Sequence, residues 1–436
     1  MRFQRRSTCE RRLVFWLLAA TTLGGGRVAA AQPAGDLQRA EIRVGIEEGD
    51  LRGADQRALQ AAVDHVARLG GGIVRIGPGR YAMRNALALR DNVDIVGVPG
   101  KTILAACDGF HSPLAADGDC NERQITLADA SGFQVGDGVT VQDQRAGGGF
   151  AVTTATLTAR VDPRTFRISA PLYLDYMVAN HASAKLAFPV VGGWQVHNVS
   201  IEGLTIDGNR GKSEPLDGCR GGGIYLFECS AVTLRNCVVR RYNGDGISFQ
   251  VSEDVIVEDC LAEDNAGIGL HPGSGSQRPI VRRSRAIRNG GDGMFVCWRV
   301  KHGVFENNEL CANLLSGISI GHKDTDNLFR NNTSSGNGAF GLLFRNEDEP
   351  MGAHRNLFED NRIVDNGAQA KGGEPRAAIV IRGHHHDLVF RRNTIGNSNP
   401  GAEATIGILA GRHADGLKAE DNRFLNVKTE IQPEGK

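Results

Sequence analysis

The feature that most constrains this chain is an internal repeat of 23–24 residues. Short apolar runs recur after Gly-rich turns, and the first six begin at intervals of 23, 23, 24, 24 and 24 residues. The runs begin at Ile224, Ile247, Leu270, Met294, Ile318 and Leu342 and, after an insertion, at Ile379 and Ile408. A repeat of this length, with about three short strands in each period, predicts a parallel β-helix.

Two columns of turn residues keep the same register. The first column reads Cys237, Cys260, Ser284, Asn308, Asn332, Asn361, Asn393 and Asn422. The second reads Asn265, Asn289, Asn313, Asn337 and Asn366. Identical amides that recur at the spacing between strands, about 4.8 Å, can hydrogen-bond along the stack. We therefore expect Asn ladders inside the solenoid.

The segment before the repeats predicts a helix that covers the open end of the solenoid. Apolar residues at positions 59, 62, 63, 66 and 69 share one helical face, and Gly70 to Gly72 end the pattern. A strand, Ile73–Ile76, follows. The run LQAAVDHVARLGGGIVRIGPGRY, residues 59–81, resembles the N-terminal cap of the pectate-lyase-like superfamily. The resemblance implies an all-β, right-handed parallel β-helix with an N-terminal capping helix.

The chain divides into four predicted segments: a signal peptide at 1–31, a cap with the first coils at 32–106, a small β-rich insertion at 107–193, and β-helix coils at 194–436. The insertion could wall one side of a substrate groove or be a structural addition. Cys107 and Cys120 bracket its first part and could form a disulfide.

The N-terminus is typical of an exported protein. Five arginines between positions 2 and 12 precede the apolar run Leu13–Leu23, and Ala29 to Ala31 offer a cleavage site. The run is short for a membrane span, so we expect a secreted or periplasmic monomer with no membrane contact after cleavage. Six of the 50 basic and one of the 50 acidic residues lie in 1–31, so the rest has a net charge of −5. This negative net charge does not indicate nucleic-acid binding.

The candidate site follows from strand alternation. In the first strand of each coil, positions 1 and 3 are apolar and should face the core, so positions 2 and 4 should face outward. The outward and adjacent turn positions gather polar and aromatic side chains in the middle coils. We predict catalytic roles for His271, His322, Lys323 and Arg345. We predict substrate contacts for Tyr225, Gln250, Trp298, Arg299, Asp324, Glu347 and Arg382.

This basic patch on an acidic protein suits an acidic polysaccharide. Removing the C5 proton of a uronate needs a neutralised carboxylate, a base and an acid. Arg345 and Arg299 can neutralise the carboxylate, whereas His271, His322 and Lys323 can exchange the proton. Basic neighbours should lower the pKa of Lys323 and of the histidines. Protonation of the leaving oxygen gives a lyase, and reprotonation on the other face gives an epimerase. We favour the lyase.

The middle coils resemble mannuronan C5-epimerases, on the segments GIGLHPGSGS and GGDGMFVCWRVKHGVFENN. That family has Asp-Pro-His-Glu, followed one coil later by Asp. This chain has His271 before Pro272, then Gly273, and Cys297 at the later position. The resemblance implies the location of the site and leaves the epimerase reaction open.

A second resemblance is to polygalacturonases, on NGDGISF and SGISIG. It implies a catalytic Asp245, with Asp292 two coils, roughly 9–10 Å, away. Inverting hydrolases use two carboxylates at about this separation. Both lie in Gly-Asp-Gly turns, where Asp is common for backbone reasons. A third alternative is a glycan-binding β-helix without catalysis.

Metal binding is not predicted from a sequence motif. Adjacent residues of a strand point to opposite sides, so His384, His385 and His386 do not suit a three-His metal site. Calcium is possible because carboxylates and Asn abound near the turns, although no calcium loop motif is present.

Overall fold

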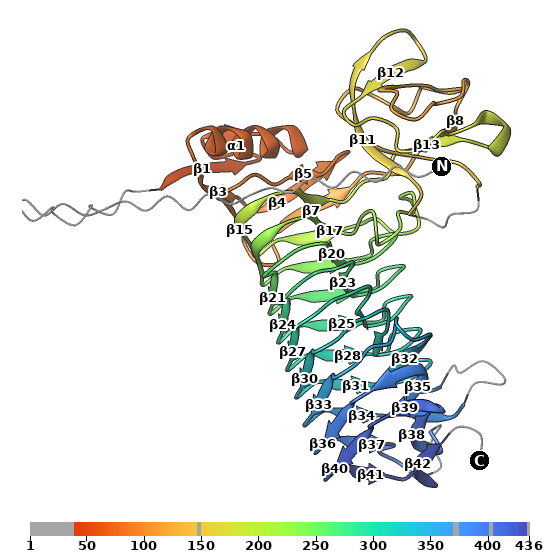
Figure 1. Cartoon of the computed structure of the whole chain (residues 1–436). Coiled ribbons are helices and arrows are strands. Elements are labelled where there is room, and N and C mark those ends of the chain that lie inside the picture. Colours follow the sequence, from red (N-terminus) through yellow and green to blue (C-terminus); the bar gives the residue numbers. More distant parts are fainter. Residues whose placement is uncertain (1–38, 146–149, 369–374, 401–403, 434–436) are drawn as a thin grey trace, which may run out of the picture. The chain divides into compact units, whose positions relative to one another are not determined.

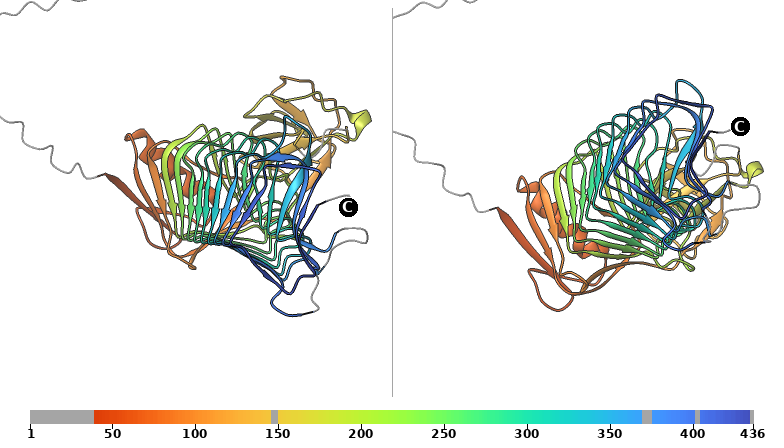
Figure 2. Two further views of the ribbon diagram at one scale, coloured as in Figure 1. Left: turned by 60° about the horizontal axis from the view of Figure 1, so that its bottom comes forward. Right: turned by 90° about the horizontal axis from the view of Figure 1, so that it is seen from below.

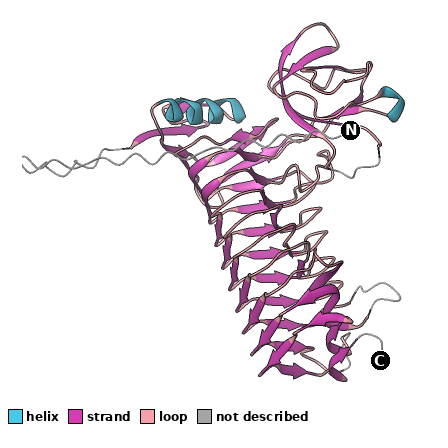
Figure 3. Cartoon of the chain, viewed as in Figure 1, coloured by secondary structure: helices cyan, strands magenta, loops and turns pink. Residues whose placement is uncertain are grey.

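The computed structural model describes residues 39–145, 150–368, 375–400 and 404–433. The predicted signal peptide lies outside them. Three long parallel sheets run through the described coils, each coil giving one short strand to each sheet (Figures 1 and 3). Figure 2 shows the coils stacked behind one another. The predicted parallel β-helix is confirmed. In the part of the chain that the structure describes, no helix has the length and apolar character needed to cross a bilayer.

We name the three sheets A, B and C. The strands of sheet A are, in order, β2 (Leu51–Arg52), β1 (Ala40–Gly45), β3 (Gly72–Ile76), β6 (Val93–Val96), β15 (His197–Glu202), β18 (Ser230–Arg235), β21 (Ile256–Glu258), β24 (Ile280–Arg282), β27 (Val304–Glu306), β30 (Leu328–Arg330), β33 (Leu357–Glu359), β36 (Val389–Arg391) and β40 (Lys418–Glu420). The strands of sheet B are β4 (Gly79–Met83), β7 (Thr102–Ala106), β16 (Thr205–Asp207), β19 (Val238–Arg240), β22 (Leu261–Glu263), β25 (Arg285–Ile287), β28 (Glu309–Cys311), β31 (Thr333–Ser335), β34 (Arg362–Val364), β37 (Thr394–Gly396) and β41 (Arg423–Leu425).

Sheet C carries the strands whose starts define the repeat. Its strands are β5 (Leu87–Ala88), β14 (Val191–Trp194), β17 (Ile224–Phe227), β20 (Ile247–Gln250), β23 (Leu270–Gly273), β26 (Met294–Phe295), β29 (Ile318–Ile320), β32 (Leu342–Glu347), β35 (Ala377–His386), β38 (Ile406–Ala410) and β42 (Thr429–Pro433), with β39 (His413–Asp415) paired to β35. The strand starts Ile247, Leu270, Met294 and Ile318 are partners in the register, so the repeat read from the sequence is the coil itself.

The predicted Asn ladders are present inside the turns. Asn308 Nδ2 donates to Asn332 Oδ1 at 3.0 Å, and Asn332 Nδ2 donates to Asn361 Oδ1 at 3.0 Å. Each side-chain oxygen also accepts the backbone N–H of the previous rung. Beside this ladder, buried rings stack from coil to coil, with centroids of Phe329 and Phe358 4.5 Å apart. The coils are thus joined by polar and apolar columns as well as by the sheets.

Helix α1 (Gln56–Arg68) covers the first coil, as predicted. Asp55 caps its N-terminus by accepting the backbone N–H of Arg57 at 3.0 Å. The helix buries Leu59 and Val63 against β1 and β3. Gly70 and Gly71 follow with φ of 92° and 113°, which side chains other than glycine rarely adopt.

The insertion forms a separate six-stranded antiparallel sheet. Its strands are, in order, β8 (His111–Pro113), β13 (Ser183–Lys185), β10 (Gly138–Gln142), β11 (Thr153–Arg160), β12 (Thr165–Ile168) and β9 (Gln124–Thr126), and a short 3-10 helix, η1, spans Val178–Asn180. The coils resume at β14, which starts at Val191 and pairs with β5 and β17, slightly before the predicted boundary at 193.

The structure does not contain the Cys107–Cys120 disulfide that the sequence allows. All eight cysteines of the described residues are free thiols. Cys107 follows β7 and is partly buried, whereas Cys120 is exposed and its Sγ lies 3.6 Å from the Tyr173 carbonyl oxygen. The two thiols therefore have different partners, and proximity to one insertion does not bring them together.

Candidate active site

The candidate site lies on the outward side of sheet C, between β20 and β32. The outward residues of successive strands are neighbours in the register: Ser248 beside His271, and Phe295 beside Ser319. The turns that lead into these strands add acidic side chains at the same edge. Because adjacent coils are about 4.8 Å apart, side chains from four or five coils can meet here.

Asp245 and His271 form a buried pair at the start of this region. One oxygen of Asp245 accepts the Ile268 N–H at 2.8 Å, and the other is 2.7 Å from His271 Nδ1. Asp245 is 5% exposed and His271 is 3% exposed. Since Nδ1–H donates to the carboxylate, neutral His271 carries its lone pair on Nε2. That nitrogen is buried and has no hydrogen-bond partner among the described residues, so the pair can act as a base.

Arg345 contacts the same aromatic ring, Phe295, as His271 of this pair. Its guanidinium carbon is 4.2 Å from the ring centroid, and His271 contacts the same ring edge-on at 5.4 Å. The guanidinium donates to the Val296 carbonyl at 2.8 Å and to Ser319 Oγ at 3.0 Å. These bonds hold a nearly buried cation in one orientation against the ring that His271 also contacts.

His322 and Glu347 extend the polar network beyond Arg345. His322 Nε2 is 3.0 Å from a Glu347 oxygen, and its Nδ1 is 3.4 Å from the Arg345 guanidinium. Burial, aided by Arg345, lowers the pKa of His322 to about 4, so this imidazole is neutral at pH 7. The direction agrees with the prediction, but burial contributes more to the lowered pKa of His322 than the basic neighbour does. With Nε2–H donating to Glu347 and Nδ1 accepting from Arg345, both nitrogens of His322 are engaged.

Asp324 lies beneath the same guanidinium. Its carboxyl accepts the Val300 N–H at 2.9 Å and the Gly321 N–H at 3.1 Å, and it is 3.4 Å from Arg345. Burial raises the pKa of Asp324 to about 7 against the effect of these partners. The side chain is fully buried and its oxygens are engaged by these three partners, so it supports Arg345.

A β-bulge in β32 sets the direction of Arg345. Phe344 pairs with Ile381, but the next pair is Glu347 with Gly383, so the strands are out of step at Arg345. His385 fixes the bulge, because its Nε2 donates to the Arg345 carbonyl at 2.9 Å and its Nδ1 accepts the Ala353 N–H at 2.8 Å. Bulges often re-aim side chains next to functional sites.

Asp292 is a second carboxyl at the same edge. Its side chain accepts the Ser316 N–H at 2.7 Å and is nearly buried. Burial raises the pKa of Asp292 to about 6, with Asp245 adding to the rise and Arg345 opposing it. The charges of Asp245 and Arg345 therefore both act on this carboxyl, which can hold a proton near neutral pH.

Asp292→Asn should stabilise the protein above pH 6. Below pH 4 the carboxyl is protonated in the folded and the unfolded chain. Between pH 4 and 6 only the unfolded chain loses its proton, so the wild-type protein loses stability while the variant does not. The difference of about two pKa units corresponds to a gain of up to about 3 kcal/mol, and Asn keeps an oxygen for the Ser316 N–H. Urea denaturation of both proteins at pH 4 to 8 measures this gain in unfolding free energy.

Asp254→Asn is the matched control. The Arg278 guanidinium lowers the pKa of Asp254, so its carboxylate stabilises the fold above pH 4 and the amide should bring no gain at any pH. A loss of stability for Asp292→Asn at pH 7 would instead identify Asp292 as a structural carboxylate.

Other predicted residues lie at the edge of the network. Trp298 is 43% exposed and packs on His322 with ring centroids 5.0 Å apart. The guanidinium of Arg299 lies 5.7 Å from the Trp298 ring. Lys323 is half-buried, and its backbone N–H donates to the Met351 carbonyl at 2.7 Å. Arg382 packs on Phe340 at 5.6 Å, in a later coil than His271.

Tyr225 and Gln250 differ from the expectation of exposed outward positions. Both face away from the core, and a loop of the chain covers Tyr225. Tyr225 is 2% exposed, and its hydroxyl donates to the Cys219 carbonyl at 2.9 Å. Gln250 is buried, and its Nε2 donates to Ser248 Oγ. Tyr225 is therefore not available for direct contact with a substrate in this conformation.

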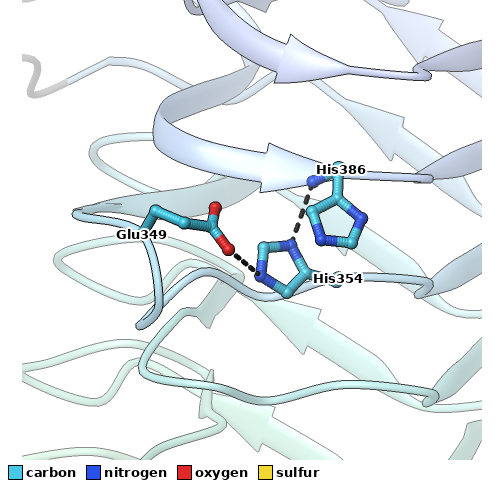
Figure 4. Close-up of side chains that lie close together, drawn as sticks. All are labelled: Glu349, His354 and His386. Carbon is cyan, nitrogen blue, oxygen red and sulfur yellow. Dashed lines mark hydrogen bonds and ion pairs between the residues drawn. The ribbon is translucent and has the colours of Figure 1, made fainter.

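The three consecutive histidines point in different directions, as the strand alternation requires. His385 is buried in the bulge, whereas His384 stacks on His413. Figure 4 shows His386 beside His354 and Glu349, whose ligand atoms lie within 4.8 Å of one another. However, His354 Nδ1 accepts the His386 backbone N–H, which places the proton of neutral His354 on Nε2, the atom that faces Glu349. Such a tautomer does not suit a metal ligand. Calcium binding stays a prediction.

The Asp245–His271 pair and Asp292 are the features that sequence reasoning underrated. Asp245 and Asp292 occupy Gly-Asp-Gly turns, where a backbone role explains Asp equally well. His271 lies 26 residues after Asp245, which is one coil plus three residues. That spacing was a usable signal, because it places the two side chains on neighbouring coils near the same edge.

Comparisons with known proteins agree with the fold. The family model "Right handed beta helix region" matches residues 190–349. The mannuronan C5-epimerase AlgE5 of Azotobacter vinelandii is 28% identical over 352 residues, which are 79% of this chain and 25% of that protein. The mannuronan C5-epimerase AlgE2 of the same organism is 23% identical over 331 residues, which are 74% of this chain and 24% of that protein. The chain thus spans about a quarter of the length of these relatives.

Solved structures show the same architecture. The A-module of the Azotobacter vinelandii mannuronan C-5 epimerase AlgE4 has a TM-score of 0.56 and 17% identity, with 89% of this chain and 97% of that chain covered. The AlgE6 A-module has a TM-score of 0.55 at 17% identity, with 89% and 95% covered. These identities show the fold alone. Together with the three parallel sheets, they establish that the chain is a right-handed parallel β-helix protein.

Proposed function

We propose that this protein is an exported enzyme that acts on a uronate-containing, acidic polysaccharide by removing the proton next to the carboxylate, and that the reaction ends in β-elimination. The observation that carries the proposal is the buried Asp245–His271 pair, whose Nε2 has no hydrogen-bond partner among the described residues and whose imidazole shares the Phe295 ring with Arg345. A neutral imidazole held by a carboxylate is a common general base.

In this reaction His271 Nε2 takes the C5 proton of the sugar. Asp245 stabilises the imidazolium that results. Arg345 lies close to the charge that develops on the uronate carboxylate and offsets it. The electron pair of the broken C5–H bond forms the C4–C5 double bond, and the C4–O4 bond breaks. Asp292, whose pKa is raised to about 6, supplies the proton to the leaving oxygen.

The arrangement of these groups favours elimination. Asp245, His271, Asp292 and Arg345 all come from sheet C or from the turns that lead into it. A base and an acid on one surface reach one face of the sugar ring, which suits loss of the proton and the leaving group from the same side. Inversion at C5 needs a second proton donor on the opposite face.

A C5-epimerase is the second candidate, because AlgE2 and AlgE5, which match about three quarters of this chain, carry that name. The chain departs from the residue pattern of that family at His271, Gly273 and Cys297. These departures change the base and its neighbours, so an epimerase with this chain's residues would have to transfer protons differently from that family. The first step, removal of the C5 proton, is common to both candidates.

Incubation with a panel of uronate polymers separates the alternatives. Elimination gives new chain ends together with ultraviolet absorbance from the unsaturated sugar. Inversion changes the C5 configuration, visible by NMR, without breaking the chain. New reducing ends without absorbance would indicate a polygalacturonase-like hydrolase instead. Binding to a polymer without turnover would indicate a glycan-binding β-helix, and neither binding nor turnover would contradict the proposal.

Arg345→Ala should lower kcat by about 10²–10³-fold, the loss typical for removal of one charge-stabilising donor. Arg345→Lys keeps the charge but loses the bonds to Val296 and Ser319, so its activity should fall between those of the wild type and Arg345→Ala. Circular dichroism and thermal melting check the fold. Arg330→Ala, which removes an exposed arginine of sheet A, is the control and should leave kcat unchanged. Unfolding of both Arg345 variants would mean that Arg345 is structural.

A further inference from the structure

The coil that precedes the candidate site carries an unusually long loop. Sixteen residues, 208–223, separate β16 from β17, whereas only six, 241–246, separate β19 from β20 in the next coil. We call residues 213–220 of this loop the plug. The plug lies on the outward side of sheet C, at the end of the candidate site that is closer to the insertion.

Hydrogen bonds attach the plug to the outward residues of two strands. The Cys219 carbonyl accepts the Tyr225 hydroxyl at 2.9 Å, and the Gly218 carbonyl accepts Ser248 Oγ at 2.6 Å. Tyr225 is 2% exposed and Ser248 is fully buried as a result. A Cβ atom added to Gly218 would lie 1.7 Å from an Asp245 oxygen, so the plug contacts the Asp245–His271 pair itself.

Further contacts hold the plug from both sides. Leu216 is buried, and its backbone N–H donates to the Asn243 carbonyl at 3.1 Å. The Asn243 side chain in turn donates to the Ser213 carbonyl at 2.6 Å. From the insertion, the Phe150 carbonyl accepts Arg220 Nε at 2.7 Å. The plug is therefore a fixed part of the protein and not an open loop.

Cys219 and Arg220 of the plug border a cavity of about 270 Å³ that extends over the coils from β17 to Trp298. The lining residues are Phe150, Cys219, Arg220, Phe227, Gln250, Ser274 and Trp298. Gln250 Oε1 is buried there without a partner among the described residues, so it can accept a hydrogen bond from a ligand hydroxyl. Aromatic rings beside such an acceptor suit a sugar ring. The volume is near the lower limit of small-ligand pockets, which limits the cavity to a terminal sugar or two.

From these observations we propose that the protein binds the end of a polysaccharide chain, with the terminal sugars in the cavity against the plug. This inference rests on the proposed function. Beyond His271, the outward side of sheet C is filled by the plug at Ser248 and Tyr225, so a chain cannot continue through the site. The polymer extends from the site past Trp298, toward the later coils.

The dependence of the rate on chain length tests this inference. Fractions of one polyuronate with different mean lengths are compared at equal mass. The initial rate should follow the molar concentration of chain ends, so halving the length should double the rate. The viscosity of the long polymer should fall slowly. A rate that depends only on total uronate, with rapid loss of viscosity, would overturn the inference but leave the proposed function intact. Absence of turnover and binding with every polyuronate would overturn both.

Binding stoichiometry provides a readout that does not depend on turnover. Calorimetry with oligouronates of increasing length should give one protein per chain at every length, whereas an internal binder would place several proteins on long chains. A variant in which 208–223 is replaced by a six-residue turn, the length found in the next coil, should bind long chains at more than one position. An unchanged preference for chain ends in the folded variant would contradict the role of the plug.

Discussion

His271→Ala is expected to lower kcat by about 10²–10⁴-fold, the range for loss of a general base. The physical reason is that Nε2 of His271 is the one nitrogen of the Asp245–His271 pair that is free to accept a proton. Steady-state kinetics with the best substrate of the polyuronate panel measures the loss. KM should change little, because the imidazole is buried and contributes to proton transfer more than to binding.

A double-mutant comparison makes this prediction specific. Asp245→Asn removes the carboxylate that fixes the tautomer of His271, so it should also lower kcat strongly. If the two residues act as one unit, the double variant should be no slower than the slower single variant. Additive losses would mean that Asp245 and His271 act independently, as a polygalacturonase-like role for Asp245 would require.

Asn332→Ala is expected to have the largest effect on stability, at least about 3 kcal/mol. Asn332 Oδ1 accepts the backbone N–H and the Nδ2–H of Asn308, and its own Nδ2 donates to the Phe305 carbonyl and to Asn361. Alanine leaves these buried groups without partners, and each unsatisfied buried group costs about 1–3 kcal/mol. Urea denaturation measures the loss of unfolding free energy.

Arg330→Ala on the adjacent strand is the control for this measurement. Arg330 is exposed and pairs with Glu306, and exposed ion pairs contribute about 0–1 kcal/mol. A loss for Asn332→Ala as small as that for Arg330→Ala would mean that water replaces the amide in the ladder and that neighbouring coils need no side-chain link.

The fold could be predicted because each coil repeats the same local pattern. Apolar residues such as Ile318 and Ile320 face the core in every coil, and Asn332 occupies the same turn as Asn308 and Asn361. A pattern that is repeated many times remains readable even where single coils deviate. The capping helix had its own local signals, the N-cap at Asp55 and the glycines that follow Leu69.

The site could be predicted only in part, because strand alternation gives direction but not exposure. It correctly brought His271, His322 and Arg345 to one side of sheet C. It could not show that the 208–223 loop covers Tyr225, since that depends on tertiary contacts such as the one from Cys219. It also could not show the bulge at Arg345, where two strands lose their common register.

The Asn ladder has a consequence for how such proteins can diversify. Consecutive rungs from Asn308 to Asn422 are separated by 24, 29, 32 and 29 residues, yet the amide contacts stay at 2.9–3.0 Å. Loop length therefore varies without any change in the scaffold. Loops between the rungs can therefore be lengthened or trimmed while the amide contacts are kept, so the surface of such a protein can diversify separately from the ladder that joins its coils.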